Sequence, residues 1–190
     1  RSRRKLSVFT YLEFASEWNL FQDLIHLQFT QYTIKMDYID GIIRYAMLDN
    51  VPEDRRNFQN RDQCRNAFFA IAGARAKDFD TDRDAFIGAY RTYANPAAVE
   101  NNRCSNSLAH GDNGCAAMRI EIELAPGKSR EIAVLAGIGK AEREGKNILR
   151  KYGKLAALRK ELERVREHWH SRLNVMTVTL PPNLSLICKA

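Results

Sequence analysis

Apolar and polar side chains that alternate with a period of two constrain the fold of this chain more than any other feature. Two segments alternate clearly, Lys5–Ala15 and Met118–Leu124. A period of two is typical of a β-strand, because successive side chains of a strand point to opposite faces of the sheet. In the first segment both faces are apolar at the middle, with Val8 and Leu12 on one face and Phe9 on the other. We therefore predict a mainly β protein whose first strand is buried on both sides at its middle.

Three further strands are predicted between these two segments. Two runs of β-branched and aromatic residues, Gln31–Asp37 and Gly41–Leu48, flank the pair Asp40-Gly41. An Asp-Gly pair between two such runs is a strong hairpin signal. The run A-F-F-A-I-A-G-A, Ala67–Ala74, fits a strand that is buried.

A second hairpin is predicted around the turn A-P-G-K-S at residues 125–129. It pairs Met118–Leu124 with a return strand that contains Ile132 and Val134. The alternation with Arg119 and its charged neighbours predicts that one face of this hairpin is in contact with water.

The segments between the predicted strands carry no clear element. Val51–Gln63 is polar and contains a proline, so we expect a loop there. Glu17–Gln28 suits either a short helix or another strand. Arg75–Gly114 is expected to be irregular, with glycines, a proline and several asparagines. Irregular segments of that length inside a domain are often functional.

The apolar period changes in the last third of the chain. An apolar stripe with spacings of three and four predicts an amphipathic helix, and its members are Leu155, Leu158, Leu162, Val165 and Trp169. Charged residues occupy the opposite face. A helix of this kind, after a mainly β region, is expected either to cover a sheet or to connect to a further domain.

Four aspartates occupy every second position of K-D-F-D-T-D-R-D-A-F, from Asp78 to Asp84. A calcium loop of the EF-hand type that began at Asp78 would have its first three ligands in place. However, its sixth position requires glycine and is Arg83, and its twelfth requires glutamate and is Ala89. We therefore interpret the run as an Asx-rich turn, whose carboxylates accept hydrogen bonds from nearby backbone N–H groups and cap the next element.

Charge and composition argue against nucleic-acid and membrane partners. The formal net charge is +7 and hydrophobic residues make up 45% of the chain, as in ordinary folded proteins. The positive surplus lies in residues 1–5 and 140–172, and the rest is mildly acidic. A phosphate-binding groove needs positive charge clustered on one shaped surface. No apolar run approaches the length that spans a bilayer.

The cysteines predict neither a metal site nor secretion. Cys64, Cys104, Cys115 and Cys188 form no C-x-x-C pair and have no paired histidine at ligand spacing. Their even number would permit two disulfides. Since the chain shows no signal-peptide pattern, we expect reduced cysteines and a cytoplasmic location. The chain opens without methionine and closes soon after a Pro-Pro pair, which predicts a fragment of a longer polypeptide.

No catalytic motif is evident. His168 and His170 flank Trp169 and would project from different faces of a helix, so they cannot share a metal. His110, beside Asp112 in a glycine-rich turn, would allow an acid–base pair, but no Ser or Cys nucleophile motif accompanies it. We interpret it as a polar loop residue. The P-loop, dinucleotide, nucleophile-elbow and zinc-protease motifs are absent from the sequence.

Three motifs follow one another in the central region: F-D-T-D-R-D-A-F-I-G-A-Y-R (Phe79–Arg91), N-P-A-A-V-E (Asn95–Glu100) and N-S-L-A-H-G (Asn106–Gly111). Together with L-S-V-F-T-Y-L-E-F (Leu6–Phe14) and L-A-P-G-K-S-R-E-I (Leu124–Ile132), they resemble a family of inverting carbohydrate phosphorylases. That family includes cellobiose, cellodextrin and chitobiose phosphorylases. The resemblance covers most of the chain, and the aspartate run then becomes a structural turn that positions the A-Y-R loop.

The resemblance implies a large antiparallel β-sandwich, a helical linker, an (α/α)6 catalytic barrel and a small C-terminal β domain. On that pattern, residues 1–140 are part of the β-sandwich, residues 141–173 the linker, and residues 174–190 the start of the barrel. The catalytic acid, an aspartate of the barrel, lies beyond residue 190, so this chain is expected to be inactive alone and to hold no catalytic residue. The family uses inorganic phosphate as its nucleophile, and the resemblance implies neither a cofactor nor a metal.

The resemblance also implies a homodimer in which the sandwich approaches the active site of the partner subunit. In that arrangement Tyr90, Arg91 and Tyr93 are candidate substrate-binding residues, since aromatic faces stack on glucose rings and a guanidinium donates to hydroxyls or phosphate. The alternative is structural, with Tyr90 in the core and Arg91 paired with a nearby aspartate. Both interpretations stay open at this point.

Within the family, the segments N-R-D-Q-C-R-N-A-F-F and H-G-D-N-G-C depart from the patterns associated with cellobiose phosphorylases, which favours a cellodextrin phosphorylase. The whole protein is then expected to be a glycosyltransferase that phosphorolyses β-linked gluco-oligosaccharides to glucose 1-phosphate with inversion. A phosphorylase or synthase active on β-1,2-glucan is an alternative. A free-standing carbohydrate-binding or interaction module with a β-sandwich fold is another, from a different class.

Overall fold

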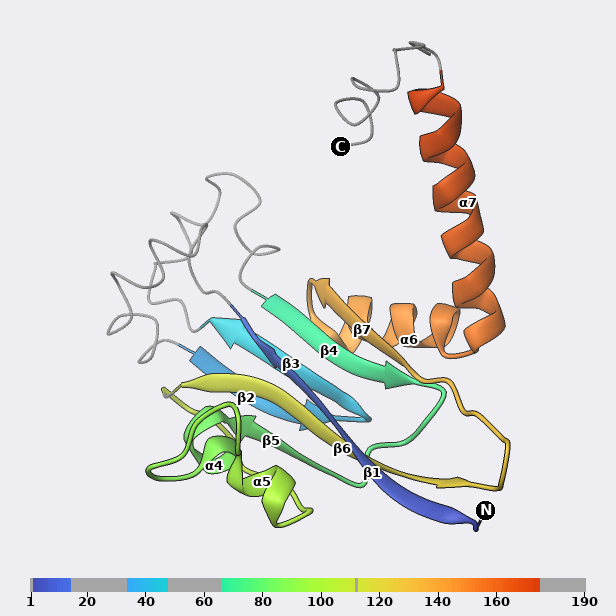
Figure 1. The fold of residues 1–190 in the computed structure, drawn as a ribbon. Coiled ribbons are helices and arrows are strands. Elements are labelled where there is room, and N and C mark those ends of the chain that lie inside the picture. The colour runs from blue at the N-terminus through green and yellow to red at the C-terminus, as the bar shows by residue number, and fades with distance from the viewer. Residues whose placement is uncertain (1, 15–33, 48–65, 112, 175–190) are drawn as a thin grey trace, which may run out of the picture. The chain divides into compact units, whose positions relative to one another are not determined.

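The computed structural model describes residues 2–14, 34–47, 66–111 and 113–174. The chain divides into two units, Arg1–Leu155 and Ala156–Ala190, and each is described by itself. The first unit is built on two antiparallel β-sheets (Figure 1). The prediction of a mainly β protein with a late helix is therefore confirmed. No helix in the described ranges is long and apolar enough to cross a membrane.

The larger sheet contains the predicted Asp-Gly hairpin. Its strands, in order across the sheet, are β2 (Ile34–Ile39), β3 (Ile42–Met47), β4 (Asn66–Ala72) and β7 (Ala133–Ile138). Between β2 and β3 the backbone has φ of 51° at Asp40 and 87° at Gly41. Both values are positive, as the two-residue turn that matches the twist of a hairpin requires. The hairpin is confirmed, and so is a buried strand close to Ala67–Ala74.

The smaller sheet has the order β1 (Arg4–Glu13), β6 (Gly114–Leu124) and β5 (Asp78–Asp82). Here β1 runs antiparallel to β6 along its whole length, so that residues far apart in the sequence are paired. Arg4 lies opposite Leu124, and Glu13 lies opposite Cys115. Among the strands that the structure describes, the first predicted strand therefore lies at the edge of this sheet.

The main core fills the space between the two sheets. Met36, Ile43 and Phe69 come from the larger sheet, and Met118 and Ile120 come from β6; each is 2% exposed or less. Burial of a side chain of this size contributes roughly 1.5–3 kcal/mol relative to leaving it exposed. Every second side chain of these strands therefore points into the core, and burial of these apolar side chains stabilises the packing of one sheet on the other.

A second core covers the outer face of the smaller sheet. The short helices α4 (Arg83–Ile87) and α5 (Ala97–Glu100) lie against this face (Figure 1), and Phe86 of α4 is 3% exposed. Phe9 of β1 packs into this second core, while Val8 and its neighbours on the other face pack into the main core. The prediction that β1 is buried on both sides at its middle is confirmed.

The outer face of the larger sheet is covered by η2 (Ala141–Gly145) and α6 (Lys146–Tyr152) (Figure 1). Gly145 lies against the ring of Phe68 and the side chain of Ile42. Arg44 of β3 is paired with Glu142 at 2.6 Å, which adds a polar contact between sheet and helix. The first unit is thus layered, with helical segments outside each sheet.

Helix α7 (Leu155–Leu173) lies in the second unit apart from its first residue, and it confirms the predicted amphipathic helix. Its apolar stripe is largely exposed: Leu162 is 51%, Val165 42% and Trp169 55% exposed. The polar face carries ion pairs one turn apart, such as Arg166 with Glu163 at 2.8 Å. The expected contact of this stripe with a sheet or a further domain stays a prediction.

The predicted hairpin of Met118–Leu124 with the strand around Ile132 and Val134 is wrong. The two strands belong to different sheets, β6 pairing with β1 and β5, and β7 pairing with β4. The turn at residues 125–129 therefore carries the chain from one sheet to the other. The predicted wet face is wrong for most of β6, because a core covers each face of the strand and Arg119 is buried. Only towards the end of the strand does this face reach water, at the half-buried Glu121 and the exposed Glu123.

The prediction that Arg75–Gly114 is irregular is also wrong, because β5, α4 and α5 all lie within it. A strand that reads D-F-D-T-D has low intrinsic β propensity. It forms because each of its carboxylates has a partner elsewhere in the chain, as described below. The predicted loop Val51–Gln63 and the ambiguous segment Glu17–Gln28 lie outside the described residues.

Candidate functional site

The candidate loop is positioned by the aspartate run, whose members have different partners. Asp78 forms a buried ion pair with Arg119, and the two residues are 8% and 5% exposed. Arg119 Nε donates to both carboxylate oxygens at 2.9 and 3.0 Å, and the N–H of Cys104 donates to Oδ1 at 3.0 Å. Burial alone would raise the pKa of Asp78, but these hydrogen bonds outweigh it and hold the pKa below its ordinary value.

Asp80 joins β5 to the segment of residues 104–109. One of its carboxylate oxygens, Oδ1, accepts hydrogen bonds from the N–H and the hydroxyl of Ser105 at 2.9 and 2.6 Å. The same oxygen accepts from the N–H and the hydroxyl of Ser107 at 3.0 and 2.8 Å. The next residue, Thr81, accepts from the N–H of Ala109 at 2.8 Å. These bonds fix the chain that returns from α5 to β6.

Asp82 caps α4. Its Oδ1 accepts from the N–H groups of Asp84 and Ala85 at 2.8 and 3.3 Å, so it satisfies two donors at the helix start. Asp84 itself is exposed and pairs with Arg83 at 3.4 Å. The interpretation of a capping turn is therefore right for Asp82. It is wrong for the earlier aspartates, which lie in a strand. In the part of the chain that the structure describes, no group of three acidic, histidine or cysteine side chains could hold a metal ion.

The loop itself leaves α4 at Gly88 and leads to α5. Gly88 has a φ of +88°, and a Cβ on it would lie 2.7 Å from the Cβ of Ala97, so only glycine fits here without displacing the start of α5. Tyr90 follows with a φ of 59° and is fully exposed. The alternative that placed Tyr90 in the core is wrong.

Arg91 turns back towards α5. Its guanidinium pairs with Glu100 and donates to the carbonyl of Asn95 at 3.4 Å. The Asn95 side chain accepts from the N–H of Thr92 at 3.2 Å, which closes the loop on itself. The structural interpretation of Arg91 as an ion-pair partner therefore describes its position well, although its partner is a glutamate and not an aspartate.

Tyr93 reaches across to β1. Its hydroxyl donates to Glu13 Oε1 at 2.7 Å, and the Tyr11 hydroxyl donates to the same oxygen. The rings of Tyr11 and Tyr93 meet edge to face with centroids 6.0 Å apart. Burial and the hydrogen bond to Glu13 raise the pKa of Tyr11, and that hydrogen bond followed by burial raises the pKa of Tyr93. Both phenols therefore remain protonated donors at neutral pH.

The structure thus builds a cluster of four residues, Tyr11, Glu13, Arg83 and Tyr93, which we call the Tyr93 cluster. Arg83 is included because it lies near enough to Glu13 for the carboxylate charge to raise the pKa of its guanidinium. Of the three predicted site residues only Tyr93 lies in this cluster, and it is 61% exposed. The cluster offers an accessible aromatic ring beside a carboxylate and a guanidinium, which are groups that bind sugar rings and hydroxyls.

Three members of the Tyr93 cluster were not predicted. Tyr11 and Glu13 do share the outward face of the first strand, which the period of two indicates. That pattern does not reveal which loop lies above the face. Arg83 occupies the position where a calcium loop requires glycine, and no pattern in the sequence connects it with the first strand.

His110 lies away from this cluster. Its Nε2 is 3.6 Å from Oδ1 of Asp37, which also pairs with Arg44. The preceding residue, Ala109, accepts from the N–H of Met36 at 2.8 Å, so this stretch is held along β2. Asp112, the expected partner of His110, lies outside the described residues. The placement agrees with a polar loop residue that contributes to the packing of β2.

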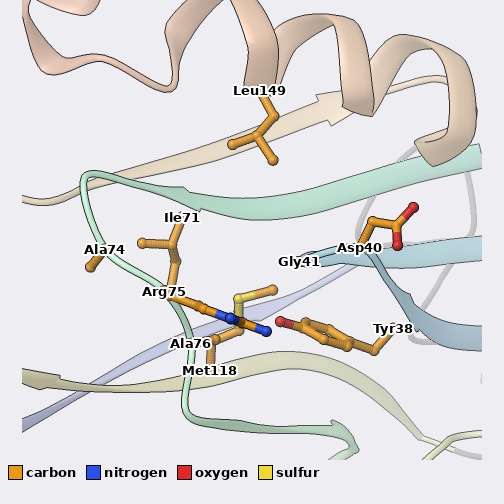
Figure 2. A pocket seen from close by; sticks show the side chains of 9 residues that line it. All are labelled: Tyr38, Asp40, Gly41, Ile71, Ala74, Arg75, Ala76, Met118 and Leu149. Carbon is orange, nitrogen blue, oxygen red and sulfur yellow. The ribbon is translucent and has the colours of Figure 1, made fainter.

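A separate hollow opens at the end of the sandwich beside the β2–β3 turn (Figure 2). Its volume is about 570 Å³. The walls are apolar for the most part, with Ile71, Met118 and Leu149 among them, and the polar side chains include those of Tyr38 and Arg75. The hollow lies within the first unit and draws on both sheets and α6.

Comparisons with known proteins identify the family. Residues 1–155 match the family model described as "Glycosyl hydrolase 94, supersandwich domain". A protein of Vibrio furnissii named N,N'-diacetylchitobiose phosphorylase is 31% identical over 178 residues, which are 94% of this chain and 21% of that relative. A protein of Vibrio proteolyticus with the same name is 28% identical over 178 residues, again 94% and 21% of the two chains.

The chain therefore spans about a fifth of the length of these curated relatives. Its similarity to them is distant but extends over nearly all of its residues. The family model covers well over half of the chain and includes both sheets, the candidate loop and the helical segments up to the start of α7. This chain belongs to the glycosyl hydrolase 94 family, and residues 1–155 correspond to its supersandwich domain.

Proposed function

We propose that the protein carrying this domain is an inverting glycoside phosphorylase, and that this chain is a non-catalytic part of it. The observation that carries the proposal is the family match over residues 1–155, supported by relatives that are named as phosphorylases. In the proposed reaction a phosphate oxygen attacks the anomeric carbon while the glycosidic C–O bond breaks. A carboxylic acid of the catalytic domain protonates the departing oxygen, and inversion converts a β-glycoside into an α-sugar 1-phosphate.

The proposed substrates are β-linked oligosaccharides. The departures of this sequence from the cellobiose phosphorylase pattern support a cellodextrin. The similarity to two proteins named N,N'-diacetylchitobiose phosphorylase supports a disaccharide of N-acetylglucosamine as a second candidate. Both candidates have β-1,4 linkages, and they differ in the substituent at C2 of each ring and in the number of rings. A β-1,2-linked glucan is a third candidate.

We propose that the Tyr93 cluster is the part of this domain that contacts sugar. Its exposed ring and the neighbouring charged groups lie on one surface, formed by the loop after α4 and the end of β1. Tyr90, also fully exposed, extends that surface. Arg91 supports the loop through Glu100, so its contribution to binding is to hold Tyr90 and Tyr93 in place.

We further propose that the whole protein is a cytoplasmic homodimer in which this surface faces the active site of the partner subunit.

A substrate panel tests the proposed function. The full-length protein would be incubated with cellobiose, cellotriose, N,N'-diacetylchitobiose and a β-1,2-linked glucose disaccharide, each with and without inorganic phosphate. We expect one of these sugars to yield a sugar 1-phosphate only when phosphate is present. Cleavage at equal rates with and without phosphate would indicate a hydrolase, and absence of cleavage across the panel would refute the proposal. Sedimentation of the same protein gives its oligomeric state.

A further inference from the structure

The hollow of Figure 2 continues into a neighbouring one. The second hollow has a volume of about 420 Å³, and both hollows are lined by Arg75 and Ala76. Lys77 and Glu121 complete the second hollow. Arg75 therefore stands at the boundary, between a mostly apolar compartment and a charged one. The two together are called the double hollow below.

The double hollow has a surplus of positive charge. Its two carboxylates already have cationic partners: Asp40 pairs with Lys146 at 2.7 Å, and Glu121 pairs with Lys5 at 3.3 Å and with Arg119 at 2.8 Å. Among the described residues, no carboxylate forms an ion pair with Arg75 or Lys77. The second hollow thus has two cations and one carboxylate, Glu121, which is already paired with residues outside the hollow. Such a surplus attracts an anion, and a guanidinium and an ammonium both match the oxygens of a phosphate group.

The first compartment can accept the uncharged part of a ligand. Tyr38 lines it, and its ring is stacked on Phe79 with centroids 4.2 Å apart and an angle of 12° between the planes, so its position is fixed. The Tyr38 hydroxyl and the Arg75 guanidinium point towards each other across the hollow (Figure 2). Burial raises the pKa of Tyr38 although the charge of Arg75 opposes this, so the phenol stays a hydrogen-bond donor at neutral pH. An apolar wall with a few fixed donors is the usual composition of a small-molecule site.

We propose that the double hollow binds a monosaccharide phosphate, with the phosphate between Arg75 and Lys77 and the sugar ring beside Tyr38. This inference rests on the proposed function, because a phosphorylase releases such a compound as its product. The double hollow is lined by none of the residues of the Tyr93 cluster. It therefore forms a second, non-catalytic site, through which the domain senses the product.

Isothermal titration calorimetry on the 190-residue chain tests the proposal, with glucose 1-phosphate as the probe and with glucose and inorganic phosphate as separate arms. We expect glucose 1-phosphate to bind more tightly than either fragment, because it alone fills both compartments. Arg75→Gln and Lys77→Gln should each weaken binding about tenfold, as expected for loss of one charged hydrogen-bond partner. Arg103→Gln, which removes an exposed arginine outside both hollows, is the matched control and should leave binding unchanged.

Three results would overturn the proposal: no binding of glucose 1-phosphate at millimolar concentration, binding that both Arg75→Gln and Lys77→Gln leave unchanged, or inorganic phosphate binding as tightly as the sugar phosphate. Because Arg75 and Lys77 are exposed side chains, the variants should remain folded, which circular dichroism checks.

The calorimetric assay needs no catalytic domain, so its outcome can be separated from that of the proposed function. A full-length protein that phosphorolyses its substrate while this chain binds no sugar phosphate refutes the second site alone. Binding without phosphorolysis refutes the proposed function.

Discussion

At the scale of single residues, the aspartate run shows how one residue type takes on different tasks through its surroundings. Asp78 neutralises a buried arginine, Asp80 gathers four donors from two serines, and Asp82 caps a helix. Their alternation places them on one side of a short strand, where the rest of the fold supplies the partners. The carboxylates therefore stabilise the framework of the candidate loop and are not available to a ligand.

Of the interactions made by the aspartate run, we expect the ion pair of Asp78 with Arg119 to contribute most to the free energy of unfolding. Asp78→Asn keeps the shape of the side chain but removes the buried counter-charge of Arg119 and leaves it only the half-buried Glu121 at 2.8 Å, so we expect a cost of about 3 kcal/mol, at the lower end for a broken buried ion pair. Glu123→Gln is the control, since Glu123 pairs with Arg3 in an exposed position and such a pair contributes at most about 1 kcal/mol. Unfolding in urea measures both values. Equal effects of the two substitutions would contradict the assignment.

The stability contributed by the same ion pair is expected to depend on pH. The pKa of Asp78 in the folded chain lies below its ordinary value of 3.8, so its contribution to stability is complete above that value. As the pH falls below 3.8 and through the folded pKa, the carboxylate is protonated and the contribution is lost. The difference in unfolding free energy between the wild type and Asp78→Asn should therefore shrink below pH 4. A difference that stays constant down to pH 2 would show that Asp78 is not the group that titrates.

Tyr93 carries the residue-scale prediction for function. In the full-length protein, Tyr93→Ala should raise the KM for the oligosaccharide several-fold, because it removes the exposed ring of the Tyr93 cluster. Tyr93→Phe keeps the ring and loses only the hydrogen bond to Glu13, so its KM should lie close to that of the wild type. The melting temperature should change little, since Tyr93 is 61% exposed. If Tyr93→Ala had the KM of the wild type, the loop would have a structural role and would not contact the oligosaccharide.

At the scale of secondary-structure elements, the sequence predicts the strands better than their partners. The alternation of Met118–Leu124 identifies β6, and the Asp-Gly turn fixes the pairing of β2 with β3, because a two-residue turn determines its own hairpin. The turn at residues 125–129 has no such restriction. Its flanking strands find partners in β1 and β4, which are distant in the sequence. Pairing of that kind depends on the whole fold and leaves no local signal.

In the candidate site too, the local features can be predicted from the sequence and the contacts between distant segments cannot. The loop with Tyr90 and Tyr93 becomes a candidate because the family resemblance implies that the sandwich approaches the partner's active site, and two tyrosines with an arginine suit a sugar. The end of β1 that completes the Tyr93 cluster could not, since Glu13 and Tyr93 are 80 residues apart. β5 is not evident from the sequence for a related reason: its aspartates favour turns by local propensity, and the groups that stabilise a strand there are distant along the chain. These groups are the backbone of β6, Arg119 and the serines of the segment 104–109.

The helix α7 gives the prediction at this scale. In this chain, Leu162→Ala should cost less than about 1 kcal/mol, because Leu162 is 51% exposed and little apolar surface returns to water. Leu135→Ala in β7 is the matched control: Leu135 is 8% exposed, and the same substitution in a core costs about 2–5 kcal/mol. Denaturant midpoints compare the two variants. A loss for Leu162→Ala as large as that for Leu135→Ala would show that the stripe is buried in solution.

At the scale of the whole molecule, the first unit is a layered β domain, and the chain spans about a fifth of the length of its curated relatives. Its cores hold two sheets together and place α4, α5 and their loop on one outer face. The Tyr93 cluster lies on that face, and the double hollow opens at the end of the sandwich. Neither site contains an activated nucleophile. Under the proposed function, the role of this domain is to present surfaces to ligands, and the chemistry belongs to the catalytic domain.

That view predicts that the 190-residue chain alone is inactive. Incubation of the chain with cellotriose or N,N'-diacetylchitobiose and phosphate should release no sugar 1-phosphate above a protein-free control. The full-length protein, assayed in parallel, is the positive control. Release of sugar phosphate by the chain alone would show that catalytic groups lie within these residues.

The most direct test of the central claim follows the phosphate itself in a reaction of the full-length protein. In a ³¹P NMR time course with the preferred sugar of the substrate panel, the inorganic phosphate signal should fall while the signal of an α-sugar 1-phosphate rises by the same amount. That result is what an inverting phosphorylase built on this domain requires. Production of free reducing sugar with a constant phosphate signal, or formation of the β-anomer, would contradict it.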